Sequence, residues 1–206
     1  MTQRGKNPSS CGDVKHAAGQ DAGRLFIVSA PSGAGKTTLC EAVRNHFDNL
    51  TYSVSYTTRA RRKGERHAVD YFFISRAEFE RGIRQNRWAE WANVHGNYYG
   101  TSAGWIARNL QAGANILLDI DVQGMRQLLR QFPEAVTIFV TVPSMAQLRR
   151  RLEQRGTDDA HTIELRMTNA EEEMKQQDQY RHVVINDDLA DARQELISIL
   201  KCYMHA

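Results

Sequence analysis

The stretch Ala30-Pro31-Ser32-Gly33-Ala34-Gly35-Lys36-Thr37 decides the fold, because it has the form of a phosphate-binding loop. An apolar run at residues 25–28 precedes it and predicts a buried strand, and apolar residues at helical spacing follow it. Its glycines let successive backbone N–H groups turn toward a phosphate, beside the positive end of the next helix. Lys36 can then reach the β- and γ-phosphates, and the Thr37 hydroxyl can hold Mg²⁺. The stretch predicts a nucleoside triphosphate site; a surface turn of small residues is the weaker alternative, and Ala30 replaces the first glycine of the general pattern.

Composition and charge narrow the class of protein. The chain has 206 residues, of which 41% are hydrophobic and 25% charged, as expected for a soluble domain with a sizeable core. A net charge of +3 is too small to suggest general nucleic-acid binding. The three cysteines have no metal-ligand spacing, and their odd number argues against a disulfide framework. No apolar run is long enough to span a bilayer and no signal peptide is recognisable, so we expect a cytoplasmic protein without a membrane or nucleic-acid partner.

Strand-like and helix-like segments alternate through the chain after a polar tail at residues 1–23. Besides the strand before the phosphate loop, the pattern predicts strands at residues 51–56, 70–74, 88–94, 115–121, 135–140 and 182–186. It predicts helices after the loop, around Phe79 and Ile83, at residues 147–156 and 159–179, and around Leu196 near the C-terminus. This alternation predicts an α/β fold in which helices cover both faces of a parallel sheet.

Polar residues on these segments are candidates for a site. Five basic side chains at residues 59–66 favour an anion site, with a solvated basic turn as the alternative. Glu90 lies in a largely apolar strand and could face either solvent or a pocket. The two tyrosines at residues 98–99 could bind a ligand or simply pack.

Two further groups stand near the ends of predicted elements. Asp119 and Asp121 end a buried strand, where a carboxylate commonly helps to place Mg²⁺ or its waters, although Asp121 could instead cap the next helix. Four arginines, at positions 149, 150, 151 and 155, lie on one short helix next to Gly156. Such a helix suits a mobile lid over phosphates, and some of these arginines would be merely solvated.

Five stretches together resemble guanylate kinases. They are Ser-Ala-Pro-Ser-Gly-Ala-Gly-Lys-Thr (29–37), Ser-Tyr-Thr-Thr-Arg (55–59), Gly-Asn-Tyr-Tyr-Gly-Thr (96–101), Leu-Asp-Ile-Asp (118–121) and Val-Ile-Asn-Asp-Asp (184–188). Their order and spacing agree over about residues 24–205, and the combination is far more specific than the phosphate loop alone. The resemblance implies a P-loop NTPase fold, a three-layer parallel-sheet core at residues 24–54, 102–146 and 169–205. To this core it adds a small GMP-binding insertion at residues 55–101 and a helical lid at residues 147–168.

The resemblance also implies an activity and a set of site residues. It implies transfer of the γ-phosphoryl group of ATP to GMP with Mg²⁺, giving ADP and GDP for guanine nucleotide recycling, and it leaves dGMP and the oligomeric state open. For ATP it implies Ala30, Pro31, Ser32, Gly33, Ala34, Gly35, Lys36, Thr37, Thr38 and, near the adenine, Asn186, with Thr37 on the metal. For GMP it implies Ser55, Arg59, Arg62, Tyr71, Glu90, Tyr99, Gly100, Thr101, Asp119 and Asp121. The catalytic charges would come from Lys36, Arg59, Arg151, Arg155 and Arg166.

The sequence departs from the family pattern at two positions, and two other functions are alternatives to the kinase activity. Arg61 stands where the family usually has proline, and Ala68 stands where it usually has glycine, before Tyr71. A non-catalytic, partner-binding module of the same fold would tend to lose the phosphate loop or the acceptor charges, which are present here. A GTP-hydrolysing switch would need an Asn-Lys-x-Asp stretch, which this sequence lacks. We further expect the insertion and the lid to close on bound nucleotides, because unpaired cations around an empty cleft repel one another.

Overall fold

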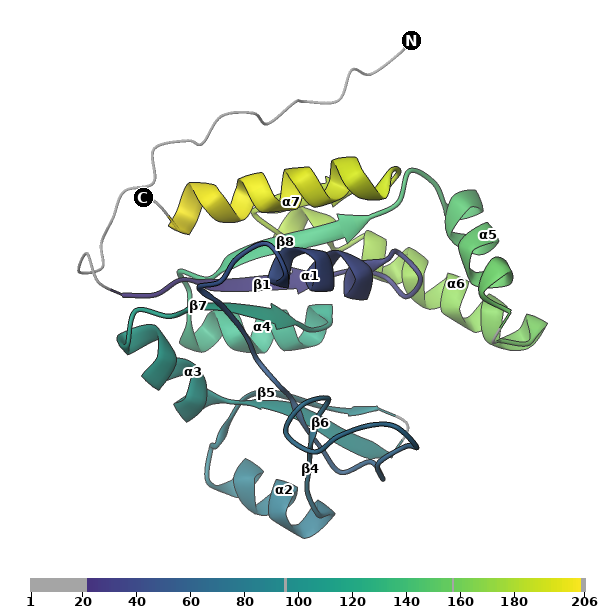
Figure 1. Cartoon of the computed structure of the whole chain (residues 1–206). Coiled ribbons are helices and arrows are strands. Elements are labelled where there is room, and N and C mark those ends of the chain that lie inside the picture. The colour runs from purple at the N-terminus through teal and green to yellow at the C-terminus, as the bar shows by residue number, and fades with distance from the viewer. Residues whose placement is uncertain (1–21, 95, 157, 205–206) are drawn as a thin grey trace.

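A central sheet carries most of the fold. The computed structural model describes residues 22–94, 96–156 and 158–204, so most of the expected tail at residues 1–23 lies outside the described part. Figure 1 shows helices on both sides of this sheet, a smaller sheet with its own helix beyond one side, and two helices at one end. In the described part of the chain, no helix has both the length and the apolar character needed to cross a lipid bilayer.

The central sheet has five strands in the order β2-β7-β1-β8-β9, and every neighbouring pair is parallel. Its strands are β1 (Leu25–Ser29), β2 (Leu50–Tyr52), β7 (Asn115–Asp119), β8 (Val136–Thr141) and β9 (His182–Ile185). The helices beside it are α1 (Lys36–Arg44), α3 (Ala103–Gln111), α4 (Val122–Gln131) and α7 (Leu189–Met204). The predicted α/β architecture is confirmed, and β1 places the phosphate loop at the middle of the carboxyl edge.

Alternation along β1 divides the core into two layers. Phe26 and Val28 pack with α1 and α7 on one face, whereas Leu25 and Ile27 pack with α3 and α4 on the other. Successive side chains of a strand point to opposite faces, so a strand that is apolar at every position must be covered on both sides. All five residues of β1 are buried, which fits this requirement.

The segment at residues 55–101 forms a second sheet with the order β4-β3-β6-β5. It consists of β3 (Tyr56–Thr57), β4 (Phe72–Phe73), β5 (Trp88–Val94) and β6 (Asn97–Ser102), with α2 (Arg76–Arg84) against it. The predicted single strand at residues 51–56 is wrong, because β2 belongs to the central sheet and β3 to the second one. The alternating tyrosines that suggested one strand pack in different places: Tyr52 lies against the central core, whereas Tyr56 stacks on Phe72.

Two helices, α5 (Met145–Arg155) and α6 (Ala160–Met174), lie at the end of the core nearest the phosphate loop. They share an apolar cluster with the buried Ala34 of that loop. The helix predicted at residues 159–179 is shorter than expected, because α6 ends at Met174 and a separate 3₁₀ turn, η1 (Gln177–Gln179), follows. The polar run from Lys175 onward offers no apolar residue to pack before Tyr180. The expected lid boundary at residue 168 therefore lies inside α6.

Candidate active site

The phosphate loop has the backbone conformation that its sequence predicts. Gly33 and Gly35 both have φ of +89°, a left-handed conformation that residues with a side chain rarely adopt. Lys36 begins α1, and Gly35 has no side chain to cap the first amides of that helix. These amides and the positive end of α1 therefore remain available to an anion.

The loop contributes to the walls of two cavities, of about 270 and 520 Å³. The larger one is called the donor cavity here. Its lining residues are Ala30, Pro31, Ser32, Gly33, Gly35, Lys36, Thr37, Thr38, Arg151, Leu152, Arg155 and Glu173. Eight of the predicted donor residues are thus on one surface, joined by two arginines of α5. Nothing in the sequence distinguishes Glu173, which lies in a run of three glutamates.

The arginines of α5 divide into two groups. Arg151 and Arg155 line the donor cavity. Arg149 instead pairs with Glu164 of α6, and Arg150 is exposed, so the expectation that some of these arginines are solvated also holds. Arg166 of α6 reaches toward the loop, with Nη1 3.5 Å from the Ser32 hydroxyl oxygen and 3.1 Å from Asp158.

Lys36 is already held at the edge of the sheet. Its Nζ lies 2.5 Å from Oδ1 of Asp119 at the end of β7, and it donates to the carbonyl oxygen of Ile120 at 3.3 Å. Both partners of the ion pair are largely buried, with side-chain exposures of 21% and 16%. The lysine is therefore fixed where a phosphate would enter, and its partner is a residue that the resemblance assigned to GMP.

The smaller cavity, about 270 Å³, is called the acceptor cavity here. It is lined by Lys36, Thr37, Tyr52, Ser53, Ser55, Asp70, Tyr71 and Asp119. Lys36 and Thr37 line both cavities, so the two spaces meet at the phosphate loop. Ser55, Tyr71 and Asp119 were expected from the sequence, but Asp70 was not, since its only signal is its position next to Tyr71.

Arg59 lies at the centre of a cluster on the insertion. Its guanidinium binds Glu65 with two hydrogen bonds of 2.7 and 3.1 Å, and its Nε donates to the Tyr99 hydroxyl at 3.2 Å. The ring of Tyr71 lies beneath it, 5.5 Å from the guanidinium carbon. The Arg59 hydrogen bond holds the pKa of the Glu65 carboxyl below its usual range. This arginine is not part of a solvated turn.

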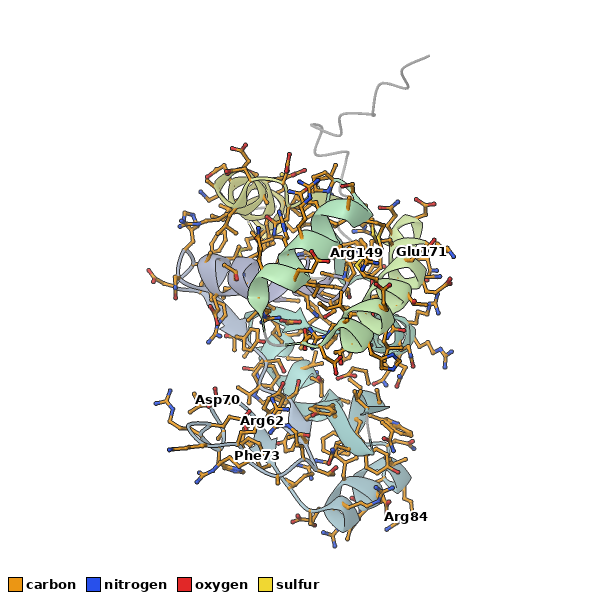
Figure 2. The ribbon with its side chains drawn as sticks, turned by 90° about the vertical axis from the view of Figure 1, so that its right-hand side faces the viewer. Arg62, Asp70, Phe73, Arg84, Arg149 and Glu171 are labelled. Carbon is orange, nitrogen blue, oxygen red and sulfur yellow. The ribbon has the colours of Figure 1, made fainter. Side chains whose placement is uncertain are left out.

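The neighbouring residues behave differently from Arg59. Arg62 is exposed, and its backbone N–H donates to the Glu65 carboxylate at 2.7 Å. Tyr98 stacks on Phe79 and is a packing residue, whereas Tyr99 joins the arginine cluster, so both readings of the tyrosines apply. Figure 2 shows Arg62 on the insertion, across the molecule from Arg149 of α5.

Glu90 faces inward from β5. It is 6% exposed, and its Oε1 accepts a hydrogen bond of 2.6 Å from the Thr101 hydroxyl. Burial raises the pKa of Glu90 to about 7, with Thr101 opposing the shift and Asp121 adding to it. The side chain of Glu90 therefore faces the protein interior and not solvent. Among the described residues that line the acceptor cavity, Glu90 is absent.

Asp121 directly precedes α4 and caps it. Its Oδ1 accepts from the Gly124 N–H at 2.7 Å, as the capping alternative predicts. A Cβ on Gly124 would lie 3.0 Å from Oε2 of Glu90 and 3.3 Å from Oδ1 of Asp121, so the two carboxylates flank this glycine. Glu90, Thr101 and Asp121 therefore lie close together, with Glu90 and Thr101 buried and Asp121 exposed.

Asn186 lies behind the phosphate loop. It is 4% exposed, and its amide Nδ2 donates to the Ala34 carbonyl oxygen at 2.7 Å. Among the described residues that line the donor cavity, Asn186 is absent. The pairing joins residues 152 positions apart, which no local pattern in the sequence could indicate.

Comparison with known proteins identifies the family. A family model described as guanylate kinase matches residues 22–203. The chain belongs to the guanylate kinase family. It is 47% identical over 179 residues to the guanylate kinase of Rubrobacter xylanophilus, covering 87% of this chain and 94% of that protein. It is 48% identical over 178 residues to the guanylate kinase of Geobacter sulfurreducens, covering 86% and 88%.

A solved structure agrees with these relatives. The crystal structure of guanylate kinase from Anaplasma phagocytophilum matches with a TM-score of 0.71 and 31% identity, covering 91% of this chain and 89% of that one. The similarity therefore spans the central sheet, the insertion and the two helices α5 and α6. Guanylate kinases transfer a phosphoryl group from ATP to GMP.

Proposed function

We propose that this chain transfers the γ-phosphoryl group of ATP to GMP, giving ADP and GDP, and that its two cavities hold the two nucleotides. The observation that carries this assignment is the meeting of the donor and acceptor cavities at Lys36 and Thr37. Phosphoryl transfer needs the donor and acceptor oxygens in line, with charge neutralised between them. One lysine shared by both spaces meets that need.

On the donor side, the loop amides and the start of α1 bind the phosphates of ATP. The Thr37 hydroxyl and the Asp119 carboxylate line the acceptor cavity beside the loop, and such hard oxygen atoms suit a divalent cation such as Mg²⁺. Bound there, the cation would neutralise charge that develops on the phosphate oxygens. Arg151 and Arg155 line the donor cavity and add positive charge from α5.

On the acceptor side, Arg59 and Tyr99 form a hydrogen-bonded pair on the insertion, and Tyr71 lines the cavity itself. We assign the GMP phosphate to this group, together with the exposed Arg62. Arginine suits the task because its planar fork can donate two hydrogen bonds to one phosphate.

We assign recognition of the guanine base to a group of four residues, of which Glu90 and Thr101 are buried. The group consists of Ser55, Glu90, Thr101 and Asp121. Guanine offers N1–H and an exocyclic amine along one edge, and a carboxylate can accept from both. Glu90 has one oxygen engaged by Thr101 and a second near Gly124. For this assignment, closure of the insertion must bring the base to Glu90.

Two other properties complete the proposal. We place the protein in the cytoplasm, where its substrates occur, and dGMP shares with GMP the base and phosphate that the site would contact. Closure of α5 and α6 over the phosphates would exclude water, which otherwise could accept the phosphoryl group.

The test is a comparison of acceptors. Purified protein is incubated with ATP, Mg²⁺ and GMP, dGMP, AMP, CMP or UMP in turn, and ADP formation is followed. Strong ADP formation with GMP, and weak formation with AMP, CMP or UMP, supports the proposal. ADP formation that is independent of any acceptor would indicate hydrolysis, and nucleotide binding without turnover would indicate a non-catalytic binding module.

A further inference from the structure

Asn186 connects three separate parts of the molecule. Directly after β9, its backbone N–H donates to the Thr141 carbonyl oxygen at the end of β8, at 2.8 Å. Its side-chain Nδ2 donates to the Ala34 carbonyl oxygen at 2.7 Å, with the contact fully enclosed. The residue is thus anchored to the central sheet and reaches the phosphate loop from behind.

The contact with Ala34 fixes the direction of the next amide. The peptide between Ala34 and Gly35 is planar and trans, so its C=O and N–H point in opposite directions. The carbonyl points toward the buried Asn186, which is not among the described residues that line the donor cavity. The Gly35 N–H is therefore directed toward the cavity, where it can donate to a phosphate oxygen.

The loop and the asparagine also fit each other closely. A Cβ on Gly35 would lie 2.4 Å from Nδ2 of Asn186, closer than any side chain could approach. Glycine at this position therefore serves the contact as well as the left-handed φ of +89°. A free Ala34 carbonyl, enclosed without a donor, would favour a rotated peptide.

The same residue also holds an arginine of α5. Its carbonyl oxygen accepts from Nη2 of Arg151 at 2.8 Å, and the Asp187 carbonyl oxygen accepts from the same nitrogen at 3.2 Å. Arg151 lines the donor cavity together with the loop. Asn186 thereby sets the position of a phosphate-binding amide with its side chain and of a cation with its backbone.

We propose that Asn186 is a positioning residue for the phosphates of the donor nucleotide, acting through Ala34 and Gly35, rather than a contact to adenine. The proposal deepens the phosphoryl-transfer function given above and rests on it. The Asn186 side chain should therefore affect the binding of every donor nucleotide, whatever base the donor carries.

The test uses N186A, which removes the donor, and N186D, which keeps the size and shape of the side chain but replaces the amide with an acceptor. Binding of tripolyphosphate, a probe without a base, is measured by calorimetry on each full-length protein. We expect both variants to bind it about 5- to 100-fold more weakly, because an enclosed carbonyl then lacks its partner. We expect kcat/KM for ATP and for CTP as donors to fall by the same factor, within about twofold, and KM for GMP to stay unchanged.

Asn115 provides the matched control. It is a buried asparagine at the start of β7, and its side-chain oxygen accepts from the Arg24 backbone N–H at 3.0 Å. N115A should lower the thermal midpoint without changing tripolyphosphate affinity. If N186A does not fold, N186D and N186S decide the question, and N186S, which retains a short donor, should be affected least.

Three results would overturn the proposal. They are unchanged tripolyphosphate binding in N186D, a large fall in the ratio of kcat/KM for ATP to kcat/KM for CTP, and an equal loss of tripolyphosphate binding in N115A. The calorimetric measurement needs no acceptor. Wild-type protein that binds tripolyphosphate but forms no GDP would therefore count against the proposed function. The role of Asn186 would still be supported or refuted by the tripolyphosphate affinities of the variants.

Discussion

Replacement of Glu90 with glutamine tests how the base is recognised. A carboxylate accepts from both donors on the guanine edge, whereas the amide of glutamine can accept only through its oxygen. Thr101 already donates to one oxygen of Glu90 at 2.6 Å, so the Gln oxygen would keep that partner and its NH₂ group would face guanine. Two donors would then oppose each other in an enclosed site.

The size of the effect follows from this mismatch. Hydrogen bonds to a charged group contribute about 1.5–3 kcal/mol, and a buried donor without a partner costs about 1–3 kcal/mol. Together they correspond to a fall in kcat/KM for GMP of about 10²–10⁴. AMP carries a lone pair at N1 that an NH₂ group can satisfy, so its kcat/KM should not fall. The GMP-to-AMP ratio should therefore drop by the full factor.

The same substitution should stabilise the protein. Burial raises the pKa of Glu90 from 4.5 to about 7, so the folded state binds more protons than the unfolded state between these values. Stability must then decrease as the pH rises through that window, by roughly 3 kcal/mol in total. E90Q lacks this loss, and we expect its free energy of unfolding at pH 8 to exceed that of the wild type.

Steady-state kinetics with GMP and AMP, and urea denaturation at pH 5 and pH 8, check both expectations. E80Q serves as the control, since Glu80 is a surface residue of α2 paired with Arg76. An unchanged GMP-to-AMP ratio in E90Q would show that guanine is read elsewhere. A variant that is inactive and also less stable at pH 8 would refute the assignment of Glu90 as a strained functional carboxylate.

Three further substitutions test other parts of the site. K36M should fold but lose about 10²–10³ in kcat, because one preorganised charge is gone; near-normal turnover would contradict the loop assignment. A68G should raise the free energy of unfolding in urea by about 0.5–1 kcal/mol, because Ala68 has φ of +63°, and a decrease would show that this backbone is unstrained. E65Q should raise KM for GMP about tenfold and leave KM for ATP unchanged, because Arg59 loses its two-point partner; equal changes in both constants would argue against a local role.

The sequence predicted the parts of the fold that depend on local pattern. The buried strand β1 and the phosphate loop follow from an apolar run and from two glycines that adopt the expected φ. The left-handed Ala68 also fits the sequence, since the related proteins were expected to have glycine there. The break between β2 and β3 was missed, because alternation is the same whichever sheet a strand joins.

The contacts within the site were harder to predict because they join distant positions. Asp119 lies 83 residues from Lys36 by their numbers, and the Asn186 contact with Ala34 spans 152 positions. Glu65 is close to Arg59 in the sequence, but it lies within residues 59–66, where only the basic side chains were considered. A motif names the residues that touch a ligand, whereas the residues that hold those residues become visible only once the chain is folded.

These holding contacts change the expected cause of closure. The sequence suggested free cations that repel one another around an empty cleft, but Lys36 is paired with Asp119 and Arg59 with Glu65. A phosphate that enters must therefore share or replace a carboxylate rather than relieve repulsion. The binding free energy gained per phosphate contact is therefore smaller. The cations are already ordered, however, so little side-chain entropy is lost when substrate binds. Binding energy then depends on contacts made only when both nucleotides are present, which favours closure over the complete pair of substrates rather than over either one alone.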